Sequence, residues 1–136
     1  MKILIMGLPG AGKTTLASEL RYCLWEKGRT VSWFNADKIR KFHNDWDFSP
    51  EGRKRQSNRM KELADNSPCD YTICDFVAPL SESRDHFNAD FIIWVDTITE
   101  GRFEDTNNIF EKPTKYNVRV TEQDAVKWAA TISDML

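Results

Sequence analysis

The stretch Ile3-Leu4-Ile5-Met6-Gly7-Leu8-Pro9-Gly10-Ala11-Gly12-Lys13-Thr14 decides the fold of this 136-residue chain. A short apolar run leads directly into Gly-x-x-x-x-Gly-Lys-Thr, the pattern of a loop that holds the phosphates of a nucleoside triphosphate. Glycines allow successive backbone N–H groups to turn toward phosphates without Cβ clashes. The alternative interpretation, a glycine-rich turn that binds nothing, accounts for neither the apolar run before the loop nor the helical pattern after it.

The loop also predicts the role of each of its side chains. We expect Lys13 to contact the β- and γ-phosphates and Thr14 to offer its hydroxyl to Mg²⁺. The amphipathic pattern of residues 15–20 predicts a helix whose N-terminus points at the phosphates. The residues expected to bind the nucleoside triphosphate are Gly7, Gly10, Ala11, Gly12, Lys13, Thr14 and Thr15.

Length and composition limit the class of protein. A chain of 136 residues with 40% hydrophobic residues has room for one core, so we expect one domain over residues 1–136. A net charge of −2 argues against a stable nucleic-acid or membrane partner, and the apolar start is too short for a signal peptide. We expect a cytoplasmic protein without a membrane span, whose three cysteines, Cys23, Cys69 and Cys74, are reduced thiols.

Apolar runs and helix signals alternate along the rest of the chain. They predict an α/β fold of the P-loop kinase-like kind, a three-layer sandwich with a doubly wound, mainly parallel five-stranded sheet and helices on both faces. Further strands are expected at residues 30–34, 71–75, 91–96 and 118–120, and helices at 15–27, 38–42, 50–66, 81–87 and 99–104. Ser49 and Pro50 predict a helix start, and residues 105–117 lack periodicity. A last helix is expected after a Thr121 cap, with an apolar face of Val126, Ala129, Ala130, Ile132 and Met135.

Two acids follow predicted strands. Asp37 comes just after the strand at 30–34, and Asp75 ends the strand at 71–75. Open α/β sheets bind ligands at the carboxyl edge, so both acids are expected beside the phosphate loop. Asp75 has two interpretations, a carboxylate near Mg²⁺ or a cap of the next turn, and the sequence does not choose between them.

The motifs of switch-type GTPases do not occur in this chain. Asp-x-x-Gly is absent, and Thr114-Lys115-Tyr116-Asn117 ends on the wrong residue for Asn/Thr-Lys-x-Asp. The small size and the lack of an arginine-bearing motor apparatus leave the kinases that phosphorylate a hydroxyl of a small acceptor.

Six segments occur in a selective order: residues 7–15, Ala36-Asp37-Lys38-Ile39-Arg40, Phe48-Ser49-Pro50-Glu51-Gly52-Arg53, Phe76-Val77-Ala78-Pro79, Val95-Asp96-Thr97 and Phe110-Glu111-Lys112-Pro113. In these segments the chain resembles the adenylylsulfate (APS) kinases of sulfate assimilation. The resemblance implies transfer of the γ-phosphate of MgATP to the 3′-hydroxyl of APS, giving 3′-phosphoadenylyl sulfate and ADP. It implies ATP and Mg²⁺ as cofactors and APS as the small-molecule partner, and it leaves a homodimer open.

The resemblance also implies roles for single residues. Asp37 takes the acidic position near the metal and the attacking hydroxyl, Arg40 and Arg53 contact the phosphosulfate, and Phe48 and Phe103 sandwich the adenine. Such an acceptor needs guanidinium groups and flat apolar faces. For Arg53 a solvated helix charge is the alternative, and for both phenylalanines it is core packing. Taken together with the phosphate loop and the acid that ends the strand at 71–75, the predicted sets are Lys13 and Asp37 for catalysis, Thr14, Asp37 and Asp75 for the metal, and Asp37, Arg40, Phe48, Arg53, Gln56, Phe76, Val77 and Phe103 for the acceptor.

The chain departs from the family pattern at several places. The family has asparagine at Gln56, serine at Asp75, and a basic lid between the strand ending in Asp96 and the final strand. Here Arg102 is followed at once by Phe103-Glu104-Asp105-Thr106-Asn107-Asn108, so we expect no basic lid and an open acceptor site. We also expect no counterpart of the extension that precedes the first strand in many members.

Two other functions stay open from the sequence. One is a kinase for another small hydroxyl or for a polynucleotide 5′-hydroxyl, which would use the basic residues of the helix at 53–61. The other is a nucleotide-binding module without turnover.

Overall fold

A computed structural model describes residues 1–136, and it contains one five-stranded parallel sheet in the order β2-β3-β1-β4-β5. This topology confirms the predicted fold class. The strands are β1 (Lys2–Met6), β2 (Val31–Asn35), β3 (Tyr71–Asp75), β4 (Phe91–Val95) and β5 (Val118–Val120). The helices are α1 (Lys13–Glu26), α2 (Ala36–His43), α3 (Pro50–Asp65), α4 (Ser81–Phe87), α5 (Glu104–Ile109) and α6 (Ala125–Met135).

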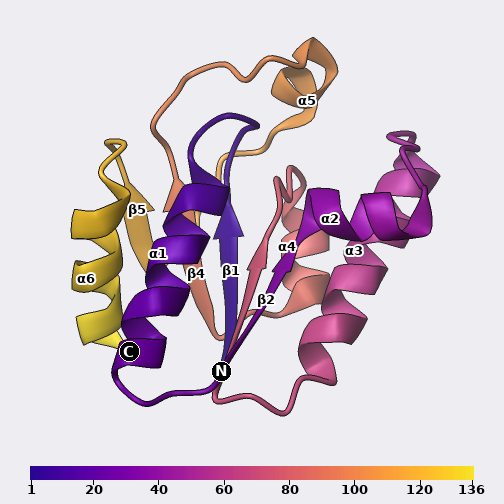
Figure 1. Cartoon of the computed structure of the whole chain (residues 1–136). Helices are drawn as coiled ribbons and strands as arrows, with labels where there is room; N and C mark the ends of the chain where they lie inside the picture. Colours follow the sequence, from indigo (N-terminus) through magenta and orange to yellow (C-terminus); the bar gives the residue numbers. More distant parts are fainter.

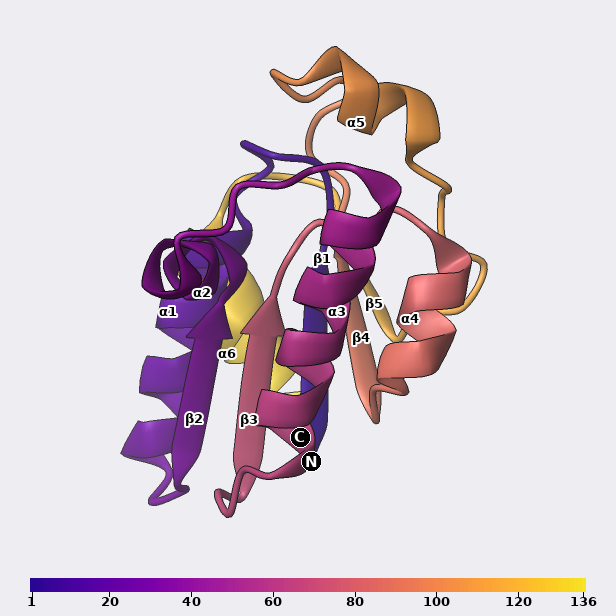
Figure 2. The same ribbon diagram turned by 90° about the vertical axis from the view of Figure 1, so that its right-hand side faces the viewer.

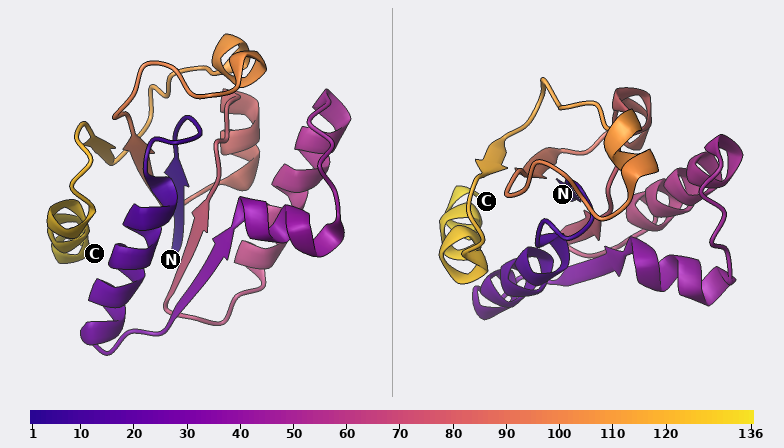
Figure 3. Two further views of the ribbon diagram at one scale, coloured as in Figure 1. Left: turned by 45° about the horizontal axis from the view of Figure 1, so that its top comes forward. Right: turned by 90° about the horizontal axis from the view of Figure 1, so that it is seen from above.

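Helices cover both faces of the sheet. Figure 1 shows α1 and α6 on one side and α3 and α4 on the other, and Figure 3 shows the same layers from above. The alternation of β1 divides the core accordingly: Ile3 and Ile5 belong to the cluster that includes α1 and α6, and Leu4 and Met6 to the cluster that includes α3. All four side chains are fully buried, as expected for a central parallel strand.

All five strands end at the same edge of the sheet. The phosphate loop follows β1 there, α2 begins directly after β2, and the loop after β3 starts at Phe76. Figure 2 shows the strands pointing toward the end of the molecule where α5 lies. The phosphate loop, the start of α2, the loop after β3 and the segment that leads from β4 to α5 therefore meet at one edge of the sheet.

The helix expected at 99–104 is wrong. Residues 96–103 contain no helix, and α5 follows them instead. The Asn107 side chain accepts from the Gly101 N–H at 2.8 Å and donates to the Gly101 carbonyl at 3.0 Å, while the Thr97 hydroxyl donates to the Ala11 carbonyl at 2.6 Å. These tertiary contacts fix the chain in an irregular path that local propensity does not indicate.

The start of the last helix is also corrected. Asp124, not Thr121, is the N-cap of α6, and its carboxylate accepts from the Lys127 N–H at 3.3 Å. Only part of the expected apolar face is buried, because Val126 is 67% exposed and Met135 is 56% exposed. The buried members of the predicted face are Ala129 and Ile132.

This face gives a matched test of the packing of α6. Ile132→Ala is expected to lower the free energy of unfolding by about 2–5 kcal/mol, because the side chain is fully buried against the α1 side of the sheet. Val126→Ala on the same helix should change it by less than about 0.5 kcal/mol. Urea unfolding of both variants checks this, and equal effects would contradict the observed orientation of α6.

The structure pairs none of the three cysteines, and Cys74 is buried whereas Cys23 and Cys69 are half-buried. None of the helices combines the length and apolar character needed to cross a bilayer.

Candidate active site

The phosphate loop links β1 to α1 through three glycines with positive φ, a conformation that disfavours other residues. Gly7 has φ +151°, and a Cβ at this position would lie 2.4 Å from the Val95 carbonyl oxygen, so the loop can pass against β4 only with glycine here. Gly12, the N-cap of α1, has φ +103°. The Lys13 ammonium donates to the Leu8 carbonyl at 3.0 Å inside the loop.

A cavity of about 660 Å³ opens at the carboxyl edge of the sheet beside this loop. Its size is in the ordinary range of small-molecule sites. Gly7 and Ala11 of the loop are buried and do not line the cavity. The predicted residues that line it are Gly10, Gly12, Lys13, Thr14, Thr15, Asp37, Arg40, Phe48, Arg53, Gln56, Asp75, Phe76, Val77 and Phe103.

The side chain of Asp75 is directed toward the phosphate loop. It is 2% exposed, and its oxygens accept from the Trp33 indole N–H at 2.7 Å, the Asn35 amide at 2.9 Å and the Thr14 hydroxyl at 3.4 Å. None of these donors belongs to the following turn, so its hydrogen bonds do not support the interpretation of Asp75 as a cap. Burial raises the pKa of this carboxyl, and the hydrogen bonds from Trp33 and Asn35 oppose the shift.

The donor set at this point suits Mg²⁺ bound together with phosphates. Such an ion usually takes one or two carboxylates, phosphate oxygens and waters, not a cage made only of protein ligands. No group of three or more His, Cys, Asp or Glu side chains is placed to hold a metal. The hydroxyl of Thr14 and the carboxylate of Asp75 are adjacent, whereas Asp37 lies exposed in the first turn of α2.

Lys13 is charged in a poorly hydrated position. Burial lowers the pKa of its ammonium to about 8, and the carboxylates of Asp75 and Asp37 only partly oppose the shift. Arg102, from the segment before α5, lowers this pKa further, so its guanidinium acts on the same region. Phosphate oxygens would favour the charged lysine.

Two of the side chains predicted to bind the acceptor are already engaged in the fold. Arg40 is 5% exposed and donates to the carbonyls of Asp45 and Asp47, each at 3.1 Å. Gln56 is 5% exposed and donates to the Ala36 carbonyl at 2.9 Å, tying α3 to α2. Both residues thus hold the wall of the cavity in addition to lining it.

Arg53 differs from these two. Its side chain is partly exposed, lines the cavity and forms no ion pair or side-chain hydrogen bond within the protein. Its neighbours on α3 are engaged: Arg55 and Arg59 both contact the Asp45 carboxylate, at 2.7 and 2.8 Å, and Lys61 pairs with Asp65. Arg53 is therefore the cavity-facing guanidinium of α3 that remains open to an anion.

Phe48 and Phe103 are each 53% exposed, which excludes ordinary core packing for both. Arg102 stacks on the Phe103 ring at 5.2 Å, and Arg102, Phe103 and Thr106 line the cavity. The chain has no basic lid, and these three side chains contribute to the wall of the cavity. An open acceptor site stays a prediction.

Several residues of the site escaped the sequence prediction. Asn35 donates to both Thr14 and Asp75, at 3.1 and 2.9 Å, and Trp33 holds the other Asp75 oxygen. Trp46 and Thr106 line the cavity. The position of Asn35 and Trp33 on a strand ending beside the phosphate loop was the available signal. For Trp46 the available signal was the polar stretch that surrounds it, residues 43–47.

Comparison with known proteins places this geometry in a family. The family model described as adenylylsulphate kinase matches residues 1–100. The chain belongs to this family. An adenylyl-sulfate kinase of Staphylococcus carnosus is 35% identical over 83 residues, which are 59% of this chain and 42% of that protein. One of Bacillus velezensis is 32% identical over 111 residues, 79% of this chain and 51% of that protein, so the chain spans about half the length of these curated relatives.

Solved structures agree with the fold of an adenylylsulfate kinase. The APS kinase of Mycobacterium tuberculosis, in complex with AMPPNP and APS, superposes with a TM-score of 0.78 at 20% identity, covering 98% of this chain and 95% of that chain. Shikimate kinase of Aquifex aeolicus gives a TM-score of 0.68 at 14% identity, covering 99% of this chain and 94% of that one. At these identities the similarity establishes the fold shared by P-loop kinases.

Proposed function

We propose that the protein transfers the γ-phosphate of ATP to the 3′-hydroxyl of adenosine 5′-phosphosulfate. The observation that carries the proposal is one continuous cavity that joins the phosphate loop to a wall with two exposed phenylalanines and the unpaired Arg53. A phosphosulfate-bearing adenosine offers a flat base and anionic oxygens that match those groups.

The donor end of the cavity would bind ATP. Backbone N–H groups of residues 10–15 and the N-terminus of α1 would stabilise the negatively charged phosphate oxygens. The Lys13 ammonium would neutralise the charge that grows during transfer. Thr14 and Asp75 would hold Mg²⁺, which supplies further charge neutralisation when bound.

The acceptor end would bind the second nucleotide. The Arg53 guanidinium would contact the phosphosulfate with Arg40 behind it, and the base would lie between Phe48 and Phe103 near Gln56, Phe76 and Val77. The γ-phosphorus–oxygen bond to ADP breaks as the bond to the 3′-oxygen forms. The hydroxyl proton passes to the carboxylate of Asp37, which lines the same cavity.

A turnover assay tests the proposal directly. ADP release is measured with MgATP alone, with APS, and with shikimate or gluconate as other hydroxyl acceptors. We expect ADP release to depend on APS and a product phosphorylated at the 3′-oxygen by ³¹P NMR. Release of ADP only with another acceptor, or with none, would overturn the proposal. The pairing of Arg55, Arg59 and Lys61 leaves the polynucleotide alternative without a supporting observation.

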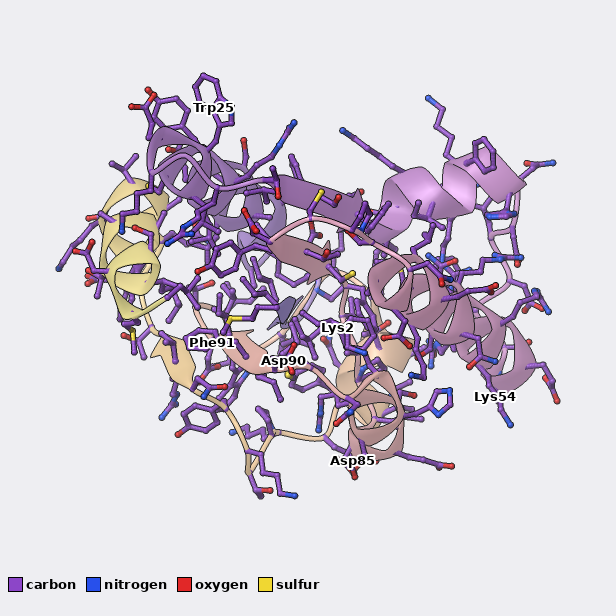
Figure 4. All side chains as sticks on the ribbon, turned by 90° about the horizontal axis from the view of Figure 1, so that it is seen from below. Lys2, Trp25, Lys54, Asp85, Asp90 and Phe91 are labelled. Carbon is purple, nitrogen blue, oxygen red and sulfur yellow. The ribbon has the colours of Figure 1, made fainter.

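Arg53 provides a test of the acceptor end. Arg53→Ala is expected to raise the KM for APS by about 10- to 150-fold, corresponding to about 1.5–3 kcal/mol for a lost charge-assisted hydrogen bond, with the KM for ATP nearly unchanged. Lys54→Ala is the matched control, because Lys54 is the next residue of the helix and projects away from the molecule (Figure 4). Equal effects of both variants would mean that only the charge of the helix matters.

A further inference from the structure

The segment between α2 and α3, residues 44–49, is held from two sides, by side chains of α3 and of α2. The side chain of Asp45 is 11% exposed and accepts from Arg55 Nε at 2.7 Å and from Arg59 Nη1 at 2.8 Å, which binds the segment to α3. Arg55 also reaches the Asp47 carboxylate at 3.2 Å. From the other side, Arg40 of α2 donates to the carbonyls of Asp45 and Asp47.

Close backbone contact fixes the same segment against α3. A Cβ on Gly52 would lie 2.1 Å from the Asp47 carbonyl oxygen and 2.5 Å from its Cγ, so the segment can approach the first turn of α3 only at a glycine. The Asp47 carboxylate accepts from the Ser49 N–H at 2.9 Å, just before the helix begins. The path of residues 45–49 is therefore determined by the protein itself.

Two aromatic side chains of this fixed segment line the cavity, Trp46 and Phe48. They are 50% and 53% exposed, so both present aromatic surface to the cavity. The guanidinium of Arg40 covers one face of the Phe48 ring at 4.3 Å, so a ligand can stack only on the other face. Trp46 supplies a second, larger aromatic surface two residues away.

We propose that Trp46 contacts the planar base of the phosphoryl acceptor and sets the preference of this site for a nucleotide over a simple sugar or acid. This inference rests on the proposed function. The wall that carries Trp46 is built before the acceptor arrives, so the contact needs no closing movement of residues 44–49. A planar base can stack on an indole in this place, whereas an acceptor without a base cannot form this interaction.

Intrinsic fluorescence and binding test the contact. The full chain, with its ATP site saturated by AMPPNP and Mg²⁺, is titrated with APS, and with ribose 5-phosphate as a probe that lacks a base. We expect APS to quench the wild-type fluorescence and ribose 5-phosphate to leave it unchanged. Trp46→Phe should lose most of the quenching and bind APS within about threefold, and Trp46→Ala should bind APS about tenfold more weakly.

Trp25→Phe is the matched control, since Trp25 is 65% exposed on α1 and projects outward, away from the sheet (Figure 4). It should keep the full quenching by APS. Undiminished quenching in Trp46→Phe, or unchanged APS affinity in a folded Trp46→Ala, would overturn the inference.

The two proposals fail separately. Quenching through Trp46 without APS-dependent ADP release would leave the contact standing and overturn the proposed reaction. APS-dependent ADP release with an unchanged KM for APS in Trp46→Ala would do the reverse. Absence of any APS binding by the wild type would overturn both.

Discussion

Replacing Lys13 with alanine is expected to reduce ATP-dependent phosphoryl transfer by about 10³-fold, with the fold intact. The ammonium is the charged group that the phosphate loop itself carries, and its effect is largest where negative charge builds up in the transition state. The side chain makes one hydrogen bond within the loop, to the Leu8 carbonyl, so its loss should have little effect on stability. Steady-state ADP release, with thermal unfolding as the check on folding, measures both effects.

Lys27→Ala is the matched control for this change. Lys27 follows the far end of α1, where it pairs with Asp134, and its removal should leave activity within about twofold. Activity of Lys13→Ala within about tenfold of the wild type would contradict the assignment of the phosphate loop.

Lys13 also predicts a pH dependence. With a pKa of about 8 in the free protein, the ammonium loses its proton as the pH rises through 8, whereas bound phosphates would hold the proton on. ATP affinity should therefore be highest below pH 8 and up to about tenfold weaker at pH 9, where nine-tenths of the groups are deprotonated. The residual ATP binding of Lys13→Ala should show no such loss.

The sequence predicts the fold well where one local signal decides the structure. The apolar runs 71–75 and 118–120 became strands with the predicted bounds, and Ser49 caps α3 as expected, its hydroxyl accepting from the Gly52 N–H. It failed at α5, whose six residues include none that is buried, so no apolar periodicity could mark it. At α6 the sequence analysis predicted a Thr121 cap, whereas the helix begins after Asp124, which is also a favourable N-cap residue type.

In the candidate site, too, some features could be predicted from a local motif and others could not. The phosphate loop acts through its backbone, which its own glycines determine, so the motif located that end of the cavity. The sequence did not predict that Arg40 also holds the wall of the cavity. The carbonyls to which it donates belong to a segment whose path depends on Arg55, Arg59 and Gly52. The choice between two roles for Asp75 needed the positions of Trp33 and Asn35 on the neighbouring strand.

Asp37→Asn and Asp75→Asn are expected to impair turnover for different reasons. Asp37 is exposed at the acceptor side, so its amide variant should lower kcat by about 10²-fold or more with little change in ATP affinity or in the Mg²⁺ requirement. Asp75 lies against the Thr14 hydroxyl, so Asp75→Asn should raise the Mg²⁺ concentration needed for half-maximal rate, and excess Mg²⁺ should restore part of the rate.

The hydrogen bonds of Asp75 require one further control. Its two oxygens accept from three donors, and an amide nitrogen cannot accept, so Asp75→Asn must lose a contact whichever way the amide turns. The double variant Asp75→Asn with Trp33→Phe removes the indole donor and should recover part of any lost stability, while the raised Mg²⁺ requirement persists. If the double variant also recovers the wild-type Mg²⁺ dependence, Asp75 acts by positioning Thr14 and not through its charge. If Asp75→Asn leaves the Mg²⁺ dependence unchanged from the start and Asp37→Asn shifts it, the two acids have exchanged roles, and the metal lies on the α2 side of the cavity.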